Sequence, residues 1–300
     1  MTTEVNALFY QTYAPGIRML AQQMRCKLAG AVDASSEKGK RVNYDQIGLV
    51  HGRTGTTRAE DTPISNVQAR TRWLSNLTID VGDLLDLEDL VRILHEPGGR
   101  FTKAMIASLN RMKDQQIVAA MLGTAFTGED GTVSTVLPAA QQIAAGGTGF
   151  TYGKLESAAD LLRGKVMFDD DDSEELFVAW TRAQEKTFLQ NPEVKSVDYN
   201  TNKVLMKGSL RDFYGFTFIR LEDFTDQYAG TQRLLPKVST TRTCVAWVKS
   251  KVIHNVAAPI DVMVAQDPSK RFGWRWYGWS VCGSTRLQEE GVVQIDVVEP

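Results

Sequence analysis

The chain has 300 residues, of which 43% are hydrophobic and 23% are charged. This length allows a sizeable core and lies where one core usually gives way to two. The 34 Lys and Arg residues are balanced by 36 Asp and Glu residues, whereas a dedicated nucleic-acid-binding protein normally has a basic excess. Three distant cysteines form no CxxC pair, which argues against disulfides or a zinc site and favours a reducing compartment. No apolar run approaches the ~20 residues that span a bilayer, so we expect a soluble, globular, intracellular protein without a membrane partner.

The first third of the chain predicts an arm followed by a long β-hairpin. Residues 5–25 have apolar side chains at helical spacing with a Pro-Gly interruption, which fits a helix or an irregular arm. Two extended runs, Val42–Val50 and Val67–Trp73, flank the polar, glycine-containing segment His51–Asp61. Extended runs on both sides of such a segment are typical of a hairpin.

This hairpin is unusually polar. Its charged residues are Arg41, Arg53, Arg58, Arg70 and Arg72, with Asp45, Glu60 and Asp61. A segment of this polarity cannot bury a core of its own, so it is either mobile or lies on another protein surface. Arginine without lysine favours the second reading, because the rigid guanidinium fork pairs carboxylates in bidentate geometry.

A strand, a short helix and a long helix are predicted next. Leu77, Ile79 and Val81 alternate with polar residues as in a half-buried strand, and the acid-rich segment Asp83–Glu96 predicts a short helix. Gly99–Gly123 has no internal proline or glycine and predicts one long helix with a buried apolar stripe. The opposite, polar side of this helix carries Arg111, Lys113, Asp114 and Gln115.

The remainder of the chain predicts a mixed α/β insert and terminal strands. The predicted elements are a hairpin (Thr127–Thr135), a loop (Ala139–Gly149), helices (Lys154–Arg163 and Arg182–Gln190), strands (Leu176–Thr181, Leu210–Leu221 and Thr243–Val248) and a β-rich end (Ile260–Val298). This order indicates an α+β fold in which the two ends of the chain flank an inserted domain.

No catalytic, cofactor-binding or metal-binding constellation is recognisable, so we expect no enzyme. The segment after His51 lacks the Lys-Ser/Thr ending of a phosphate-binding loop. The acidic run Asp169–Asp172 has Glu174 where an EF-hand needs glycine, and the three histidines are scattered. Trp274, Trp276 and Trp279 could stack on bases or sugars, but alternation within a strand is more often core or interface.

Two stretches resemble major capsid proteins of tailed bacteriophages with the Hong Kong 97-like fold. The first is the segment 80–131, which ends in GTAFTGEDG, and the second is WVKSKVIHN followed by residues 267–297, with a Gly-x-x-Arg turn before a final strand. The resemblance implies an N-terminal arm (1–35), an extended loop (36–75), a peripheral domain (76–129 and 256–300) with a spine helix at about 99–123, and an axial domain (130–255).

The resemblance implies a structural protein that self-assembles through hexamers and pentamers into an icosahedral shell around the phage genome. It would be assembled in the host cytoplasm and reside in the virion. The implied partners are further copies of the chain, a portal, a separate scaffolding protein, a decoration protein, and packaged double-stranded DNA in non-specific contact. A same-fold encapsulin-type nanocompartment shell and an intracellular α+β enzyme are the alternatives.

The extended loop is the expected site of inter-subunit contacts. The residues predicted to make them are Arg53, Arg58, Glu60, Asp61, Arg70 and Arg72. Some members of the family link subunits covalently through a lysine in this loop, but this chain has no lysine between Lys40 and Lys103. We therefore expect a shell held non-covalently, by arginine–carboxylate pairs and loop overlap.

Overall fold

The computed structural model describes residues 22–48, 50, 52, 54, 67–86, 98–164, 174–191, 210–226 and 230–299. These residues combine α-helices with largely antiparallel sheets, which confirms the predicted α+β class. The helices are α2 (Gly98–Leu122), α3 (Tyr152–Arg163) and α4 (Arg182–Leu189), and the short 3-10 turns are η2 (Ala139–Gln141), η3 (Lys249–Lys251), η4 (Pro268–Lys270) and η5 (Glu289–Gly291). Most of the predicted arm lies outside the described residues.

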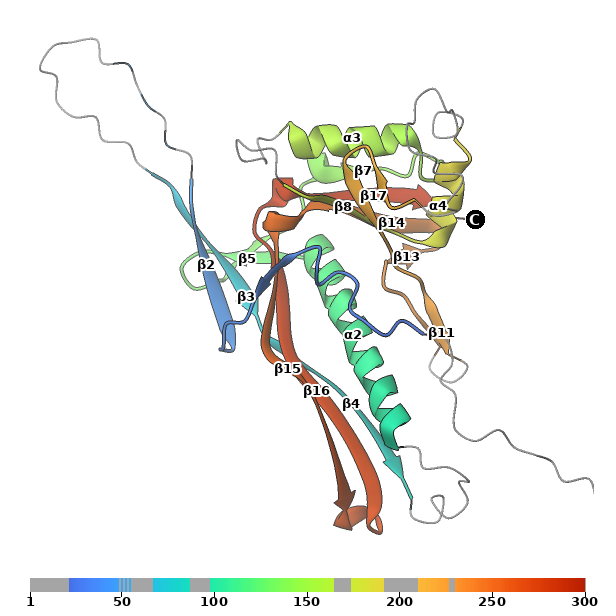
Figure 1. The fold of residues 1–300 in the computed structure, drawn as a ribbon. Coiled ribbons are helices and arrows are strands. Elements are labelled where there is room, and N and C mark those ends of the chain that lie inside the picture. The colour runs from blue at the N-terminus through green and yellow to red at the C-terminus, as the bar shows by residue number, and fades with distance from the viewer. Residues whose placement is uncertain are drawn as a thin grey trace, which may run out of the picture.

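A long sheet forms one end of the molecule, with α2 along one of its faces (Figure 1). Its strands, in order, are β1 (Asp33–Ser35), β15 (Val252–Asp267), β16 (Gly273–Arg286) and β4 (Leu77–Leu85). We call β4, β15 and β16 the tongue. The helix packs on it through Leu109 and through Phe101, whose ring centroid lies 5.8 Å from that of Trp276. Trp276 is therefore a core residue, as its alternation favoured.

Helix α2 confirms the predicted long helix to within one residue at each end. Part of its polar side, however, is not solvated: residues 23–28 lie over it and Asp114 has an exposed fraction of 0%, whereas Gln115 stays exposed. The Asp114 carboxylate accepts hydrogen bonds from the backbone N–H groups of Lys27 and Leu28, at 3.1 and 2.9 Å, and from the Cys26 thiol at 3.0 Å. These bonds replace water, so a buried carboxylate is tolerated. Burial and the neighbouring carboxylate raise the pKa of Cys26 to about 12.

The second sheet has α3 and α4 on one face and the C-terminal half of α2 on the other (Figure 1). Its strands are β7 (Gln142–Ile143), β17 (Val292–Val298), β14 (Thr241–Val248), β8 (Leu176–Trp180), β10 (Phe216–Arg220), β9 (Asp212–Phe213) and β13 (Lys237–Val238). All five residues of β8 are buried, as the sequence predicted. Strand β17 pairs with β14, so the last strand joins this sheet and not the tongue, whereas the predicted boundaries grouped 256–300 together.

A third sheet contains the extended hairpin. Its strands, in order, are β2 (Arg41–Ile47), β3 (Ala69–Ser75), β5 (Ala125–Thr127) and β6 (Val133–Thr135). Antiparallel pairing of β2 with β3, and of β5 with β6, confirms both predicted hairpins. The ribbon of β2 and β3 projects away from the tongue (Figure 1). A small separate sheet pairs β11 (Phe224–Asp226) with β12 (Gly230–Gln232).

Three local predictions need correction. The helix predicted over Asp83–Glu96 begins as strand instead: β4 continues to Leu85 because it pairs with the tryptophan-rich part of β16, and 87–97 lie outside the described residues. The strand predicted over Leu210–Leu221 is a hairpin, since Tyr214 and Gly215 both have positive φ, as in a type I′ turn. The loop predicted over Ala139–Gly149 contains η2 and the short strand β7.

Candidate assembly site at the base of the extended hairpin

The residues predicted to contact neighbouring subunits fall into three groups. Arg53, Arg58, Glu60 and Asp61 lie outside the described residues. Arg70 is exposed on β3, opposite Gln46 of β2. Arg72, two residues further along the strand, is buried, with an exposed fraction of 4%.

Arg72 is held within its own chain. Its Nη2 lies 2.7 Å from Oε1 of Glu289, and its Nε donates to the carbonyl oxygen of Leu287 at 3.1 Å. The Gln46 side chain donates to the same carbonyl at 3.1 Å. Both strands of the hairpin are thereby tied to the turn after β16. We therefore no longer assign Arg72 to an inter-subunit contact.

Glu289 also faces Arg286, which is fully buried. Arg286 Nε lies 3.8 Å from Glu289 Oε1, and its guanidinium donates to the carbonyl oxygens of Met121 at 3.0 Å, Thr135 at 2.8 Å and Gly123. Helix α2 has no basic residue in its last turn. Arg286 supplies the missing positive charge to the carbonyl end of this helix from a distant strand. Burial lowers the pKa of Arg286, and Glu289 opposes that shift.

Gly283 allows β16 to approach the hairpin strand. A Cβ atom at this position would lie 2.5 Å from the Ser75 carbonyl oxygen and 2.7 Å from Leu74 Cδ2. Only glycine fits such a close approach of two backbones. The prediction of a turn over Gly-x-x-Arg is wrong, because Gly283 and Arg286 both belong to strand β16. The chain turns after Arg286.

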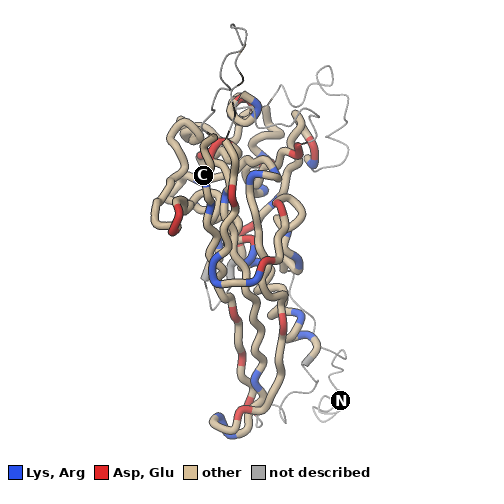
Figure 2. The backbone as a smooth tube through the Cα atoms, turned by 90° about the vertical axis from the view of Figure 1, so that its left-hand side faces the viewer, with Lys and Arg blue, Asp and Glu red and all other residues tan. Residues whose placement is uncertain are grey.

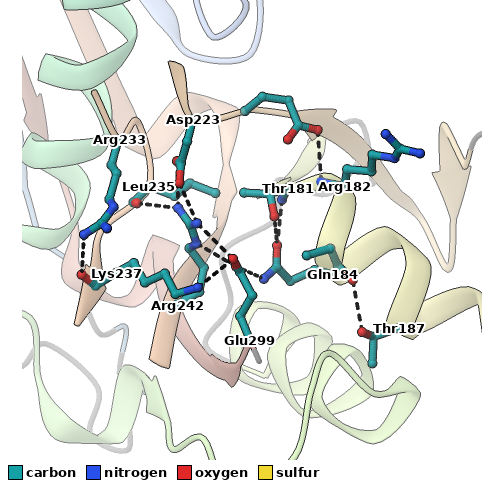
Figure 3. Close-up of polar contacts among 12 residues, drawn as sticks. Thr181, Arg182, Gln184, Thr187, Asp223, Arg233, Leu235, Lys237, Arg242 and Glu299 are labelled. Atoms are coloured by element: carbon teal, nitrogen blue, oxygen red, sulfur yellow. Dashed lines mark hydrogen bonds and ion pairs between the residues drawn. The ribbon is translucent and has the colours of Figure 1, made fainter. Parts of the chain in front are cut away.

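A second buried ionic cluster fixes the end of the chain in the seven-stranded sheet (Figure 3). Arg242 makes a bidentate pair with Asp223, at 2.8 and 2.7 Å, and its Nε donates to Glu299 at 2.8 Å. Lys237 and Gln184 donate to the Glu299 carboxylate at 2.9 and 2.8 Å. Burial alone would raise the pKa of Glu299, but these hydrogen bonds outweigh it and lower the pKa to about 2. The sequence predictions missed this cluster, since its members lie far apart in the chain.

The buried ionic groups of the described residues anchor strands and a helix end. No group of three or more His, Cys, Asp or Glu side chains among them could hold a metal ion. None of the helices in the described part of the chain is long and apolar enough to cross a membrane. The buried arginines are all engaged in holding strand ends, a helix end and the hairpin base.

Solved structures place this architecture in a known class. The head structure of Helicobacter pylori bacteriophage KHP40 aligns with a TM-score of 0.74 at 9% identity, covering 99% of this chain and 98% of that one. The capsid of cyanophage P-SCSP1u aligns with a TM-score of 0.72 at 13% identity, covering 100% of this chain and 96% of that one. The capsid of Ralstonia phage GP4 aligns with a TM-score of 0.67 at 11% identity, covering 97% of this chain and 95% of that one. The fold is the Hong Kong 97-like capsid fold, as predicted.

The sequence itself identifies the family. The model of the phage capsid protein family matches residues 5–299, so the chain belongs to that family. A comparison with curated proteins finds no match. The protein is a structural major capsid protein, which confirms the predicted function. The family role is structural and non-catalytic; it implies self-association and a place in the virion.

Proposed function

We propose that this capsid protein builds its shell through the extended hairpin of β2 and β3, which each subunit lays on a neighbour. The observation that carries this proposal is the buried anchor formed by Arg72, Glu289 and Arg286. A polar hairpin cannot hold its direction by packing a core of its own. The anchor fixes its base, while Ile47 at the far end of β2 is 81% exposed and available to another surface.

The contacts are made by the charged residues of the hairpin. We assign them to Arg53, Arg58, Glu60, Asp61 and Arg70. Each contact need contribute only a few kcal/mol, because a subunit in a shell makes several contacts that must break together. The formal net charge of −2 keeps repulsion among many copies small and leaves no strong grip on packaged double-stranded DNA, whose contacts are non-specific.

The assembly route involves further proteins. We assign the guidance of shell closure to a separate scaffolding protein and the entry of DNA to a portal. Assembly takes place in the host cytoplasm, and a decoration protein on the outside of the shell is compatible with the same fold. Expression of the chain alone tests the scaffold assignment. Regular closed shells formed by the chain on its own would contradict it.

The assembly role of the hairpin is tested by charge reversal. Arg58→Glu should leave the subunit soluble and abolish or strongly reduce shells, measured by sedimentation and electron microscopy after co-expression with the assembly partners. Arg58→Lys is the matched control, because it keeps the positive charge, and it should assemble. Normal shells from Arg58→Glu would refute the assignment of this residue.

The shell is held without covalent links between subunits. The chain has no lysine between Lys40 and Lys103 to form an amide bond from the hairpin. Mature particles on a denaturing gel should therefore give a band at the monomer mass of 33.3 kDa. A ladder of cross-linked species is the outcome that this proposal forbids.

A further inference from the structure

The buried charges of the hairpin anchor do not balance. The side chains of Arg72 and Arg286 are 5% and 0% exposed, and Glu289 is the one described carboxylate that lies within ion-pair distance of either of them. The carbonyl end of α2, to which Arg286 donates, adds a partial charge of about −0.5. Two guanidinium groups against one carboxylate and this helix end leave roughly half a positive charge in the cluster.

The second buried cluster shows how the chain balances such charges elsewhere. There, Arg242 and Lys237 face two carboxylates, those of Asp223 and Glu299, at distances between 2.7 and 2.9 Å. Basic and acidic residues are also interspersed along the described chain as a whole (Figure 2). With two cations and one carboxylate, the hairpin anchor is one anion short of the same balance.

Two N–H groups of the anchor are buried without a hydrogen-bond partner in the described structure, Nη1 of Arg72 and Nε of Arg286. Arg286 Nε lies 3.8 Å from Glu289 Oε1, which is too far for a hydrogen bond. Arg72 reaches the same oxygen atom through its Nη2, at 2.7 Å, and leaves Nη1 unused. Both guanidinium groups therefore lie beside one carboxylate oxygen, and each keeps a charged donor that has lost its water.

A small anion supplies what this cluster lacks. A water molecule could accept the hydrogen bonds, but it would not offset the excess positive charge, whereas an anion does both through charge-assisted hydrogen bonds. Burial lowers the pKa of Arg286, Glu289 raises it and the nearby Arg72 lowers it further, so the two guanidinium groups repel each other. Because Arg286 is fully buried, the site suits a single-atom ion better than an oxyanion of several atoms.

We propose that the hairpin anchor is a binding site for a small monovalent anion of the halide class, held by Arg72 Nη1 and Arg286 Nε beside Glu289. The bound ion joins three elements that are distant in the chain: strand β3 through Arg72, strand β16 through Arg286, and the carbonyl end of α2 behind Arg286. The site lies within one chain and does not depend on the assembly role of the hairpin.

Chloride-linked stability tests the site in the full-length, unassembled subunit. Urea unfolding is measured at neutral pH while sodium gluconate is replaced stepwise by sodium chloride at constant ionic strength, which keeps screening constant. Gluconate is too bulky to enter a buried site. A chloride ion with a dissociation constant of about 10 mM should lower the unfolding equilibrium constant about tenfold at about 0.1 M chloride. Bromide should have a similar effect.

Three variants distinguish this site from a general effect of chloride on the protein. Arg72→Met removes one guanidinium group and should abolish the difference between chloride and gluconate. Arg41→Met removes an exposed arginine from the neighbouring strand β2 and should keep the wild-type difference, which makes it the matched control. Glu289→Gln removes the carboxylate that competes with the ion, so its unfolding should depend more steeply on chloride than that of the wild type.

Binding to the folded subunit is measured separately by the line width of the ³⁵Cl nuclear magnetic resonance signal. The wild type and Arg41→Met should broaden the signal, bromide should reverse the broadening, and Arg72→Met should broaden it less. Equal unfolding in chloride and gluconate for the wild type would refute the site, as would an unchanged chloride effect in Arg72→Met. If Arg72→Met does not fold, the comparison of Glu289→Gln with the wild type decides, because a weaker or equal chloride dependence in Glu289→Gln contradicts the proposal.

Discussion

Removal of the charge from Glu289 is the sharpest test of the hairpin anchor. This carboxylate contacts two buried arginines, Arg72 at 2.7 Å and Arg286 at 3.8 Å. Removing one partner of a buried ion pair costs roughly 3–5 kcal/mol, because it leaves an uncompensated charge. Glu289→Gln keeps the volume of the side chain and an oxygen that can accept from Arg72. We therefore expect the free energy of unfolding to fall by about 3 kcal/mol, at the lower end of that range.

Urea unfolding of the unassembled subunit measures this loss. A fall of that size corresponds to about a hundredfold change in the folding equilibrium constant. Hydrogen exchange shows where the stability is lost. Amide protons of β2 and β3 near the base of the hairpin should exchange faster in Glu289→Gln than in the wild type, while those of β8 stay protected. Glu290→Gln is the control, since this neighbouring residue has no ion pair within the described part of the chain. Its effect should stay within about 0.5 kcal/mol.

A small loss of stability in Glu289→Gln would contradict the anchoring role of the ion pairs. If Glu289→Gln loses less than about 1 kcal/mol and the hairpin amides exchange at the wild-type rate, the ion pairs do not anchor the hairpin. The hydrogen bonds to the Leu287 carbonyl would then carry the attachment alone. Arg72→Met, which removes one of those bonds and the ion pair together, would separate the two contributions.

Three further variants test the surrounding structure. Burial lowers the pKa of His254 from 6.5 to about 4, so between these pH values the histidine binds a proton in the unfolded chain but not in the folded one. The free energy of unfolding should therefore fall by up to about 3 kcal/mol as the pH falls from 6.5 to 4. His254→Asn should remove this pH dependence in urea titrations. Against the opposing effect of burial, hydrogen bonds from Arg242, Lys237 and Gln184 lower the pKa of Glu299 from 4.5 to about 2, so its stabilising effect, about 1–2 kcal/mol after solvent screening, is present above pH 4.5 and is lost as the pH falls toward 2; Glu299→Gln should remove it at neutral pH. Gly283→Ala should cost about 1–3 kcal/mol and lower the thermal unfolding midpoint, since its Cβ would clash with Ser75, whereas Gly153→Ala, in open space, should not.

Local patterns predicted the elements of this fold well. The stripe of α2 and the alternation in β4 depend on neighbours within one turn or two residues, and such spacing is visible in a single chain. The hairpin was predictable for the same reason, because turn residues lie between its two runs. The error over Asp83–Glu96 has the opposite cause: pairing with β16, nearly two hundred residues away, overrides the acid-rich helical signal.

The anchor could not be predicted, because its members are distant in sequence. Arg72 and Glu289 are 217 residues apart, and nothing beside either of them indicates the other. Asp114 shows the same limit, since a carboxylate on the polar side of a helix is usually solvated. Here residues 23–28 cover it with backbone N–H donors. Only the tertiary arrangement shows which polar side chains are buried.

The anchor couples two parts of the subunit, the extended hairpin and the C-terminal end of α2. Arg286 binds the carbonyl end of α2, which lies along the tongue, and Arg72 binds the base of the hairpin; Glu289 contacts both. Buried ion pairs add little net stability over apolar packing, but their directional geometry strongly disfavours a shifted arrangement. A subunit that lays its hairpin on a neighbour, as proposed above, needs this hairpin at a fixed angle to the rest of its own fold. Movement of either element alone would break a buried ion pair. The anchor therefore makes the angle between hairpin and tongue a property of the single chain, set before any neighbour binds.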